Sequence, residues 1–325
     1  MAREGNHYIG VDVGGTKILV GVFNSSLKLL QTLKLSTKAE RGVETVIDRI
    51  DRAIRDAVDE ADLSLNQIRA VGLGAPGTVD PASGRVIYAI NIGWQNVPLQ
   101  KDLEKRLGLP VFIENDCKAS TLGIYHLELE PKPDSMVGIF LGTGVGGGLI
   151  LNGELHAGAN CAAGEVGHMI LGCDGAKAGH AARGCFEALA SRTAIFHQIQ
   201  SAVKDGQKTC LTEMFKGGDL QEMRSGDLRL AMRRGDKLVE KVVAEAANHT
   251  GIAVANLIHI LGPEVIVLGG GVIEALGEKM LPAIQKRAEE LVLPGAFDGV
   301  QILVSRLGDH AGISGAAVLA QRRSK

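Results

Sequence analysis

Asp116 is the residue best placed to act as a base. It follows an apolar segment, Val111–Ile113, and two polar residues, so it stands where a buried strand is expected to end. Sites of open α/β proteins lie at the carboxyl ends of parallel strands. A carboxylate there can accept the proton of a reacting hydroxyl group. An aspartate also suits the N-cap of a helix expected over 117–125, and position alone favours that structural role.

Two glycine-rich turns, 12–17 and 142–148, offer backbone N–H groups without bulky side chains in front of them. Such turns can hold a phosphate group. Asp12 adds a carboxylate beside the first turn, where a Mg²⁺ ion could be held through water. Either turn alone is also an ordinary tight β-turn, but two equivalent turns favour an anion held from both sides.

The second turn contains the letters of a dinucleotide-binding motif, G-x-G-x-x-G, over 142–147. That motif requires a helix after the loop, whereas Leu149–Leu151 predicts a strand and Asn152-Gly153 a hairpin turn. The P-loop motif G-x-x-x-x-G-K-[ST] does not occur in the chain. The sequence therefore argues against a Rossmann dinucleotide site and against a P-loop.

Glu165, His168 and Glu187 form a further polar set. Sugar hydroxyl groups both donate and accept hydrogen bonds, so a specific sugar site needs carboxylates, amides and imidazole rather than apolar walls. As isolated residues they are equally compatible with exposed glutamates and a histidine that is satisfied within the fold.

Strands and helices alternate in the first part of the chain. Apolar segments and two tight turns predict a three-strand meander over 8–35, and a one-sided apolar stripe predicts a helix over 43–58. A strand over 68–74, a helix over 99–107 and a strand over 111–114 should follow. This order requires a sheet with parallel strands and covering helices, which is an α/β fold.

The same order of strands and helices begins again after Pro131-Lys132-Pro133, a segment whose prolines interrupt regular structure. Strands are expected over 136–141 and 149–152, on either side of the second glycine turn. We therefore expect two domains that begin with the same hairpin, with a boundary near 117–134. The second half should also contain long helices, a strand before Gly269 and a final helix, over 185–203, 236–260, 264–268 and 311–321.

Composition and charge exclude several classes of protein. The chain has 325 residues, and with 45% apolar and 22% charged residues it is not a disordered protein. The formal charge of −2 and only 3% aromatic residues argue against a nucleic-acid or membrane partner. The N-terminus lacks a signal peptide's apolar core, and the five cysteines are odd in number and unevenly spaced. We expect a soluble cytoplasmic protein.

A series of motifs resembles the ROK family of sugar kinases and repressors, within the actin-like ATPase superfamily, over the whole chain. The resemblance implies two actin-like (ribonuclease H-like) α/β domains with a cleft between them. The first domain would comprise residues 1–121, with helix 311–325 packed back on it, and the second would comprise residues 122–310. The motifs are Asp12-Val-Gly-Gly-Thr-Lys17, Gly74-Ala-Pro-Gly-Thr-Val-Asp80, Asn91-Ile-Gly-Trp94, Glu114-Asn-Asp116, Gly142–Gly148, Gly164-Glu-Val-Gly-His168, Gly184-Cys-Phe-Glu187, Leu268–Val272 and Asp309-His-Ala-Gly312.

The resemblance implies ATP-dependent phosphorylation of a hexose, with Mg²⁺ as cofactor, Asp116 as general base and a homodimer or homotetramer as the assembly. The implied sugar contacts are Asn115, Glu165, His168 and Glu187, with Gly77, Thr78 and Asn91 as secondary contacts. The implied contacts to ATP and Mg²⁺ are Asp12, Gly14, Gly15, Thr16, Lys17, Gly142, Thr143 and Gly144, with Gly269, Gly270 and Gly271 on the adenosine side.

Glucose is the expected sugar, but the same residues serve kinases of N-acetylmannosamine, N-acetylglucosamine, fructose or allose and cannot separate them. A sugar-sensing regulator without turnover is a second class. The presence of Asp116 and of both glycine turns weighs against a regulator. The segment before the first strand is also short, whereas the family's repressors carry a helix-turn-helix there. A polyphosphate donor usually needs a basic groove, and no run of lysine or arginine borders the turns.

Two alternatives stay open for zinc. The family's zinc site joins the sugar-contacting histidine to three cysteines, and Ala178 and His180 stand here at two of those cysteine positions. His168, Cys173, His180 and Cys185 would make a Cys₂His₂ set, as structural zinc sites prefer. Alternatively, the loop is held by packing, and both cysteines are buried thiols.

Overall fold

The computed structural model describes residues 5–172, 182–215 and 219–325. Contacts divide the chain into two compact units. The first unit combines Met1–Asp134, Gly148–Gly164 and Asp309–Lys325, and the second combines Ser135–Gly147 and Glu165–Gly308. Each unit therefore brings together segments that are far apart in the sequence.

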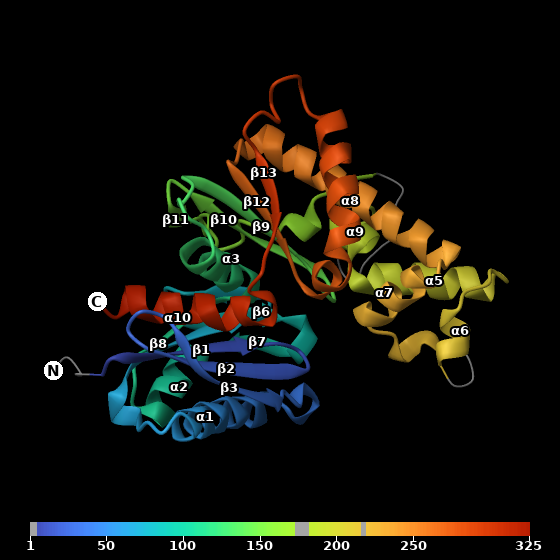
Figure 1. Ribbon diagram of the computed structural model, residues 1–325. Coiled ribbons are helices and arrows are strands. Elements are labelled where there is room, and N and C mark those ends of the chain that lie inside the picture. The colour runs from blue at the N-terminus through green and yellow to red at the C-terminus, as the bar shows by residue number, and fades with distance from the viewer. Residues whose placement is uncertain (1–4, 173–181, 216–218) are drawn as a thin grey trace. The chain divides into compact units, whose positions relative to one another are not determined.

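The first unit is built on a five-stranded sheet in the order β3-β2-β1-β4-β8 (Figure 1). The antiparallel meander expected at the start of the chain is confirmed, and β4 and β8 run parallel to β1. The strands are β1 (His7–Val13), β2 (Lys17–Phe23), β3 (Leu29–Ser36), β4 (Ile68–Ala75) and β8 (Val111–Asn115).

Helices cover both faces of this sheet, α1 (Val43–Glu60) and α2 (Leu99–Leu107) on one face, α3 (Asp116–Leu127) and α10 (Ala311–Arg323) on the other. Successive strand residues point to opposite faces. Ile9 and Val11 accordingly pack with α1, while Tyr8 packs with α10. The predicted stripe of α1 is buried at Val46, Ile47, Ile50, Ile54 and Val58.

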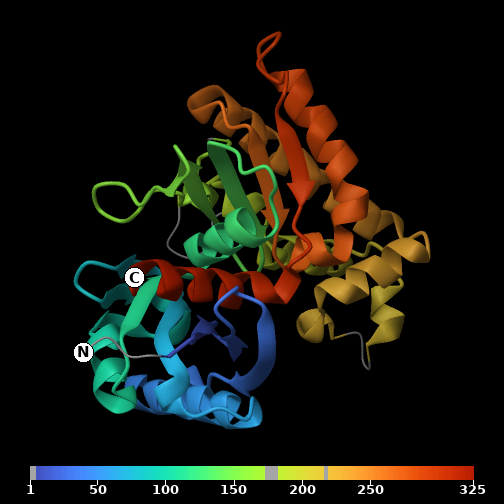
Figure 2. The same cartoon turned by 60° about the vertical axis from the view of Figure 1, so that its left-hand side comes forward.

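α10 lies alongside α3, as both views show (Figures 1 and 2). Small residues make this contact possible. A side chain on Gly315 would overlap the carbonyl oxygen of Ala119 in α3, and one on Gly72 would overlap the carbonyl oxygen of Ala316. Since backbones can approach this closely only where no Cβ intervenes, these glycines set how tightly α10 packs on α3 and on β4.

A small three-stranded antiparallel sheet inserts between β4 and α2. It consists of β5 (Thr78–Asp80), β6 (Arg85–Ala89) and β7 (Trp94–Val97), with the short helix η3 (Ile90–Ile92) between the last two strands. Strands this short carry almost no periodic signal, which is why the sequence did not predict them.

The second five-stranded sheet has the equivalent order, β11-β10-β9-β12-β13. β12 and β13 run parallel to β9, and β11 pairs with β10 in the antiparallel sense. The elements are β9 (Ser135–Leu141), β10 (Val145–Leu151), β11 (Glu154–Leu155), β12 (Val265–Gly269), β13 (Gln301–Val304), α4 (Phe186–Ala190), α5 (Arg192–Lys204), α6 (Leu211–Met214), α7 (Ser225–Arg233), α8 (Lys237–Leu261) and α9 (Gly271–Leu291).

Two predicted elements have different limits in the structure. β10 begins at Val145 rather than at 149, because the glycines 146–148 pair as strand residues and leave only Gly142–Gly144 as the turn. The helix expected over 185–203 is two helices, since the Ser191 hydroxyl accepts a hydrogen bond from Ala194 N and caps α5 (3.1 Å). Among the described helices, none combines the length and the apolar character that crossing a bilayer demands.

Candidate active site

Asp12 and Asp116 lie at one edge of the first unit's sheet. β1, β4 and β8 are parallel, and their register places Asp12 opposite Gly74 and Gly74 opposite Glu114. Asp116 follows β8 as the first residue of α3, and a Cβ on Gly74 would lie 3.2 Å from its Cα. The carboxyl ends of the three strands thus gather both carboxylates, as the sequence predicted for Asp116.

The pKa of Asp12 is raised to about 7, by burial first and then by the negative charge of Asp116. The Asp12 carboxyl group also lies against the first turn of α10, since a side chain on Gly312 would come within 2.8 Å of its Cγ. Two carboxyl groups that oppose each other's ionisation favour a cation between or beside them. Hard oxygen donors of this kind fit Mg²⁺.

Lys17 forms an ion pair with Asp309, with 2.7 Å between Nζ and Oδ1. The hydrogen bond from Lys17 holds the pKa of Asp309 below its usual range. Lys17 also lowers the pKa of Asp12, against the effect of burial. This lysine is therefore a cation that partly offsets two neighbouring carboxylates of the first unit, Asp309 and Asp12.

The first glycine turn is held by Thr37, a fully buried residue that the sequence analysis missed. Its hydroxyl donates to the carbonyl oxygen of Gly14 (2.6 Å), and its backbone N–H donates to that of Thr16 (2.9 Å). Gly15 and Thr16 are exposed, and Gly15 lies next to Asn91. Gly14 N donates within the turn, to the carbonyl oxygen of Lys17 (2.8 Å), so the exposed Gly15 and Thr16 are the residues whose N–H groups can face an anion.

Asn115, rather than Asp116, is the N-cap of α3. Its Oδ1 accepts from Cys117 N (3.0 Å) and Lys118 N (3.1 Å), and its Nδ2 donates to the carbonyl oxygen of Gly77 (3.0 Å). Asp116 is therefore not the N-cap, because the preceding residue takes that position, although the Asp116 carboxylate also accepts a hydrogen bond from Cys117 N (2.8 Å). Asn115 also ties the 77–78 segment, with the expected contacts Gly77 and Thr78, to the start of α3.

The second glycine turn, Gly142–Gly144, is held from α5. Arg192 N donates to the carbonyl oxygen of Gly142 (2.9 Å), and the Thr193 hydroxyl donates to that of Thr143 (2.7 Å). The Arg192 guanidinium also donates to the Thr143 hydroxyl (2.6 Å). No sequence motif pointed to Arg192 and Thr193, although Ser191 before them is a residue typical of a helix start.

Glu187 also contacts this turn. Its Oε2 accepts a hydrogen bond from Val145 N (2.9 Å), and a side chain on Gly144 would overlap its carboxylate. The short helix η4 (Val166–His168) packs against the same place, because a side chain on Gly167 would overlap the Val145 carbonyl oxygen. The predicted residues Glu165, His168 and Glu187 are thus brought together around the start of β10.

The triple glycine joins β12 to α9. Gly269 ends the strand, Gly270 has φ 85° at the N-cap, and Gly271 begins the helix. A Cβ on Gly270 would lie 2.6 Å from the carbonyl oxygen of Leu141, which precedes the second glycine turn. The glycines expected to contact the nucleotide therefore lie at neighbouring strand ends of the second sheet.

Of the expected zinc ligands, Cys173 and His180 lie outside the described residues. Cys185 is fully buried and His168 is exposed, on segments joined by a hydrogen bond from Phe186 N to the Met169 carbonyl oxygen (2.8 Å). Within the ranges 5–172, 182–215 and 219–325, no group of three or more His, Cys, Asp or Glu side chains is arranged to hold a metal ion.

Comparison with known proteins supports the family that the motifs indicate. The model of the ROK family matches residues 8–323. A glucokinase from Halalkalibacterium halodurans is 33% identical over 318 residues, covering 97% of this chain and 95% of that protein. An N-acetyl-D-glucosamine kinase from Pasteurella multocida is 34% identical over 326 residues, covering 95% and 98%.

A solved structure is also similar, that of a ROK family glucokinase from Streptomyces griseus in complex with glucose and AMPPNP. It superimposes with a TM-score of 0.84 at 33% identity, covering 97% of this chain and 99% of that one. The α/β fold with two equivalent sheets is therefore the fold of these enzymes. The chain belongs to the ROK family.

Proposed function

We propose that the protein phosphorylates glucose with ATP, forming glucose 6-phosphate, and that Asp116 is the general base. The observation that carries this proposal is the pair of carboxylates, Asp12 and Asp116, at the carboxyl edge of parallel strands, where the charge of Asp116 helps to raise the pKa of Asp12. Phosphoryl transfer to a hydroxyl group needs one carboxylate to take its proton and another to favour a cation.

Asp12 is the proposed residue on the Mg²⁺ side. Because no larger cluster of ligands is present among the described residues, we propose that it acts through water and phosphate oxygens. Mg²⁺, when bound, neutralises charge on the transferred phosphoryl group. Lys17 completes the set of charges next to Asp12.

The two glycine turns are the proposed phosphate contacts, Gly14, Gly15, Thr16 and Lys17 in the first and Gly142, Thr143 and Gly144 in the second. In both turns, hydrogen bonds from neighbouring elements take up carbonyl oxygens. Gly14 N and Gly142 N donate within their own turns, to the carbonyl oxygens of Lys17 (2.8 Å) and Gly144 (2.9 Å), so the other N–H groups of the two turns are the ones proposed to meet an anion. Gly269, Gly270 and Gly271, at the start of α9, are proposed to face the adenosine.

The sugar contacts are proposed at Asn115, Glu165, His168 and Glu187, with Gly77, Thr78 and Asn91 beside them. Asn115 has a second amide hydrogen besides the one that it gives to Gly77. Glu187 links sugar binding to the second glycine turn, because its carboxylate also holds Val145 N.

A kinase for another hexose or N-acetylhexosamine is the second candidate. The Pasteurella multocida relative is named an N-acetyl-D-glucosamine kinase and is as similar to this chain as the glucokinases are. A purified-protein panel of glucose, fructose, allose, N-acetylglucosamine and N-acetylmannosamine, read by a coupled ADP assay, tests both. Turnover of glucose at the highest kcat/KM supports the proposal, and turnover of none of these sugars supports the non-catalytic regulator.

Four properties stay predictions: a bound zinc ion, assembly as a homodimer or homotetramer, a cytoplasmic location and the lack of a nucleic-acid partner. For zinc, the supporting observation is that the segments of His168 and Cys185 pair with each other. Metal analysis after dialysis against a mild chelator tests it. Close to one zinc per chain supports the site, whereas full activity without zinc means that packing orients His168.

A further inference from the structure

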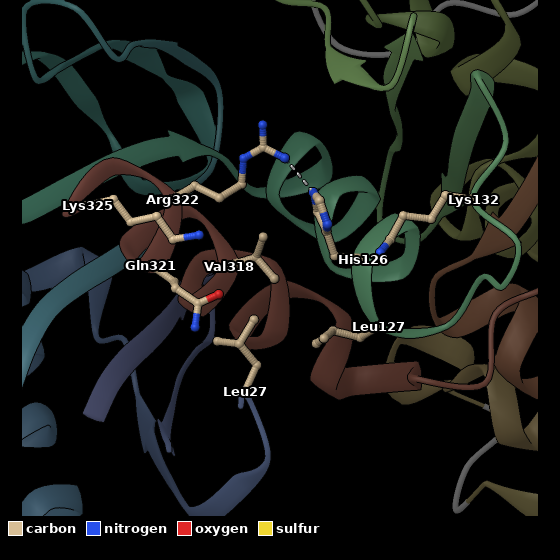
Figure 3. Close-up of a pocket in the computed structure, with 8 residues that line it drawn as sticks. All are labelled: Leu27, His126, Leu127, Lys132, Val318, Gln321, Arg322 and Lys325. Carbon is tan, nitrogen blue, oxygen red and sulfur yellow. Dashed lines mark hydrogen bonds between the residues drawn. The ribbon is translucent and has the colours of Figure 1, made fainter. Parts of the chain in front are cut away.

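A cavity of about 480 Å³ lies in the first unit, at the C-terminal ends of α3 and α10 (Figure 3). None of the residues proposed above for phosphoryl transfer lines it. Leu27, from the turn between β2 and β3, and Val318, from α10, form an apolar part of its wall. Its volume suits a small organic molecule rather than a bare ion.

The polar wall of the cavity is basic. Lys132, Arg322 and Lys325 line it, and the lining includes no aspartate or glutamate. Lys132 has a distant partner in Glu130 (3.7 Å), and Lys325 has no ion pair within the part of the chain that the structure describes. Arg322 is paired with Glu154 (2.6 Å), so the two lysines supply the positive charge, and together with the apolar wall they suit an anion attached to a small organic body.

Arg322 is held in a fixed position at this pocket. Its Nη2 donates to both carboxylate oxygens of Glu154 (2.7 and 2.6 Å), and its Nη1 lies 2.9 Å from His126 Nε2. Burial, followed by the charges of Arg322 and Lys132, lowers the pKa of His126 to about 4. His126 is therefore neutral at pH 7. Because arginine has only donors, Nε2 accepts, which leaves Nδ1–H as a donor.

The two helices that frame the pocket begin at the catalytic carboxylates. α3 starts with Asp116 and ends at Leu127, beside His126, and the first turn of α10 contacts Asp12 through Gly312. α10 carries Arg322 in its last turn. A ligand that bridges the ends of both helices would therefore contact the two elements that position Asp116 and Asp12, without approaching either carboxylate.

We propose that this pocket binds a phosphate monoester of sugar size and that binding there lowers the turnover rate. The dianionic phosphoryl group would pair with Lys132, Lys325 and the Nδ1–H of His126, and the sugar would lie on Leu27 and Val318. The identity of the ester rests on the proposed function, since hexose 6-phosphate is its product. Coupling between two sites is reciprocal for binding but not for turnover, so binding and rate are tested separately.

The binding test uses the full-length protein, with inorganic phosphate and glucose 6-phosphate as probes. The NMR signals of the His126 ring, assigned with His126→Gln, should shift with both probes at pH 7, and glucose 6-phosphate should bind more tightly. The double variant Lys132→Gln/Lys325→Gln should weaken both affinities by at least about tenfold, because two charged contacts are lost. The control Lys101→Gln/Lys105→Gln, with the same charge change on α2, should bind like the wild type.

The rate test separates this pocket from product bound at the active site. Inhibition by glucose 6-phosphate should have a component that saturating glucose does not relieve, and the Lys132→Gln/Lys325→Gln variant should lose it with an unchanged KM for glucose. Equal affinities in the double variant and the wild type would overturn the proposal, as would purely competitive inhibition. If the protein phosphorylates no hexose but the His126 shifts appear and vanish as described, the proposed function fails and the binding site stands.

Discussion

The two glycine turns occupy equivalent places, between the first two strands of sheets with the same strand order, but they are surrounded by different chemistry. The first turn lies next to three carboxylates and a lysine, namely Asp12, Asp116, Asp309 and Lys17. The second is surrounded by Glu187, Arg192 and Thr193. The glycine turn between two strands is therefore repeated in both sheets, whereas the group of carboxylates that favours a cation lies beside the first turn.

The comparison also shows two ways to hold a turn. A buried threonine, Thr37, holds the first turn from a neighbouring loop with its hydroxyl and its N–H. The N-terminus of a helix holds the second, through Arg192 N and the Thr193 hydroxyl. We therefore expect changes at the first turn to affect the chemical step and nucleotide binding strongly, and equivalent changes at the second turn to have smaller effects.

The largest expected effect comes from Asp116→Asn. It removes the proton acceptor but keeps the size of the side chain, so kcat should fall at least about a hundredfold while sugar and ATP binding stay nearly intact. Steady-state kinetics and calorimetric binding of both ligands measure this. Asp59→Asn, an exposed change on α1, is the control. A variant that keeps more than a third of the wild-type kcat would remove Asp116 from the role of base.

Sequence periodicity predicted the elements that carry the first site. The stripe of α1 and the end of β8 before Asp116 are where the apolar pattern placed them, because burial on one face leaves a regular pattern. The place of Asp12 beside the first glycine turn predicted it as a site residue, and the family resemblance assigned roles to Glu165, His168 and Glu187, which the structure groups around the start of β10.

The residues that hold the turns could not be predicted. Thr37 bonds to Gly14, which lies 23 positions earlier, and such a pairing depends on how β3 returns to the turn rather than on any local pattern. The same holds for Arg192 with Thr143, 49 positions apart. The expected folding domains, 1–121 with helix 311–325 and 122–310, stay a prediction, because compactness does not show that a segment folds on its own.

Removing one hydroxyl group that holds each glycine turn tests whether the two turns are held differently. Thr37→Val should lower kcat/KM for ATP about tenfold, since the partly buried carbonyl oxygen of Gly14 loses its donor and the turn relaxes. Thr193→Val should cost only about threefold, because Thr193 is exposed and water can replace it. Thr37→Ser keeps the hydroxyl and should restore most of the activity. If Thr37→Val and Thr193→Val have equal effects, the two turns are held equally well.

The smallest expected effect is on stability, and it tests the charges of the first turn. The pKa of Asp12 is about 7 in the folded protein against 3.8 when unfolded. Between these values the unfolded state binds fewer protons, so stability without ligand falls as pH rises from about 4 to 7 and stays low above that. Asp12→Asn removes this loss, and because Asp12 is only partly buried we expect a gain of about 1 kcal/mol at pH 8.

The matched control is Asp309→Asn, whose effect should have the opposite sign. Lys17 holds the pKa of Asp309 below its usual value, so its carboxylate adds stability above the unfolded pKa and loses it as pH falls. Thermal unfolding at pH 5 and pH 8, without Mg²⁺ or nucleotide, measures both variants. A melting temperature of Asp12→Asn that is unchanged or lowered at pH 8 would mean that Lys17 already compensates the ionised Asp12, and the first turn would then need no further cation.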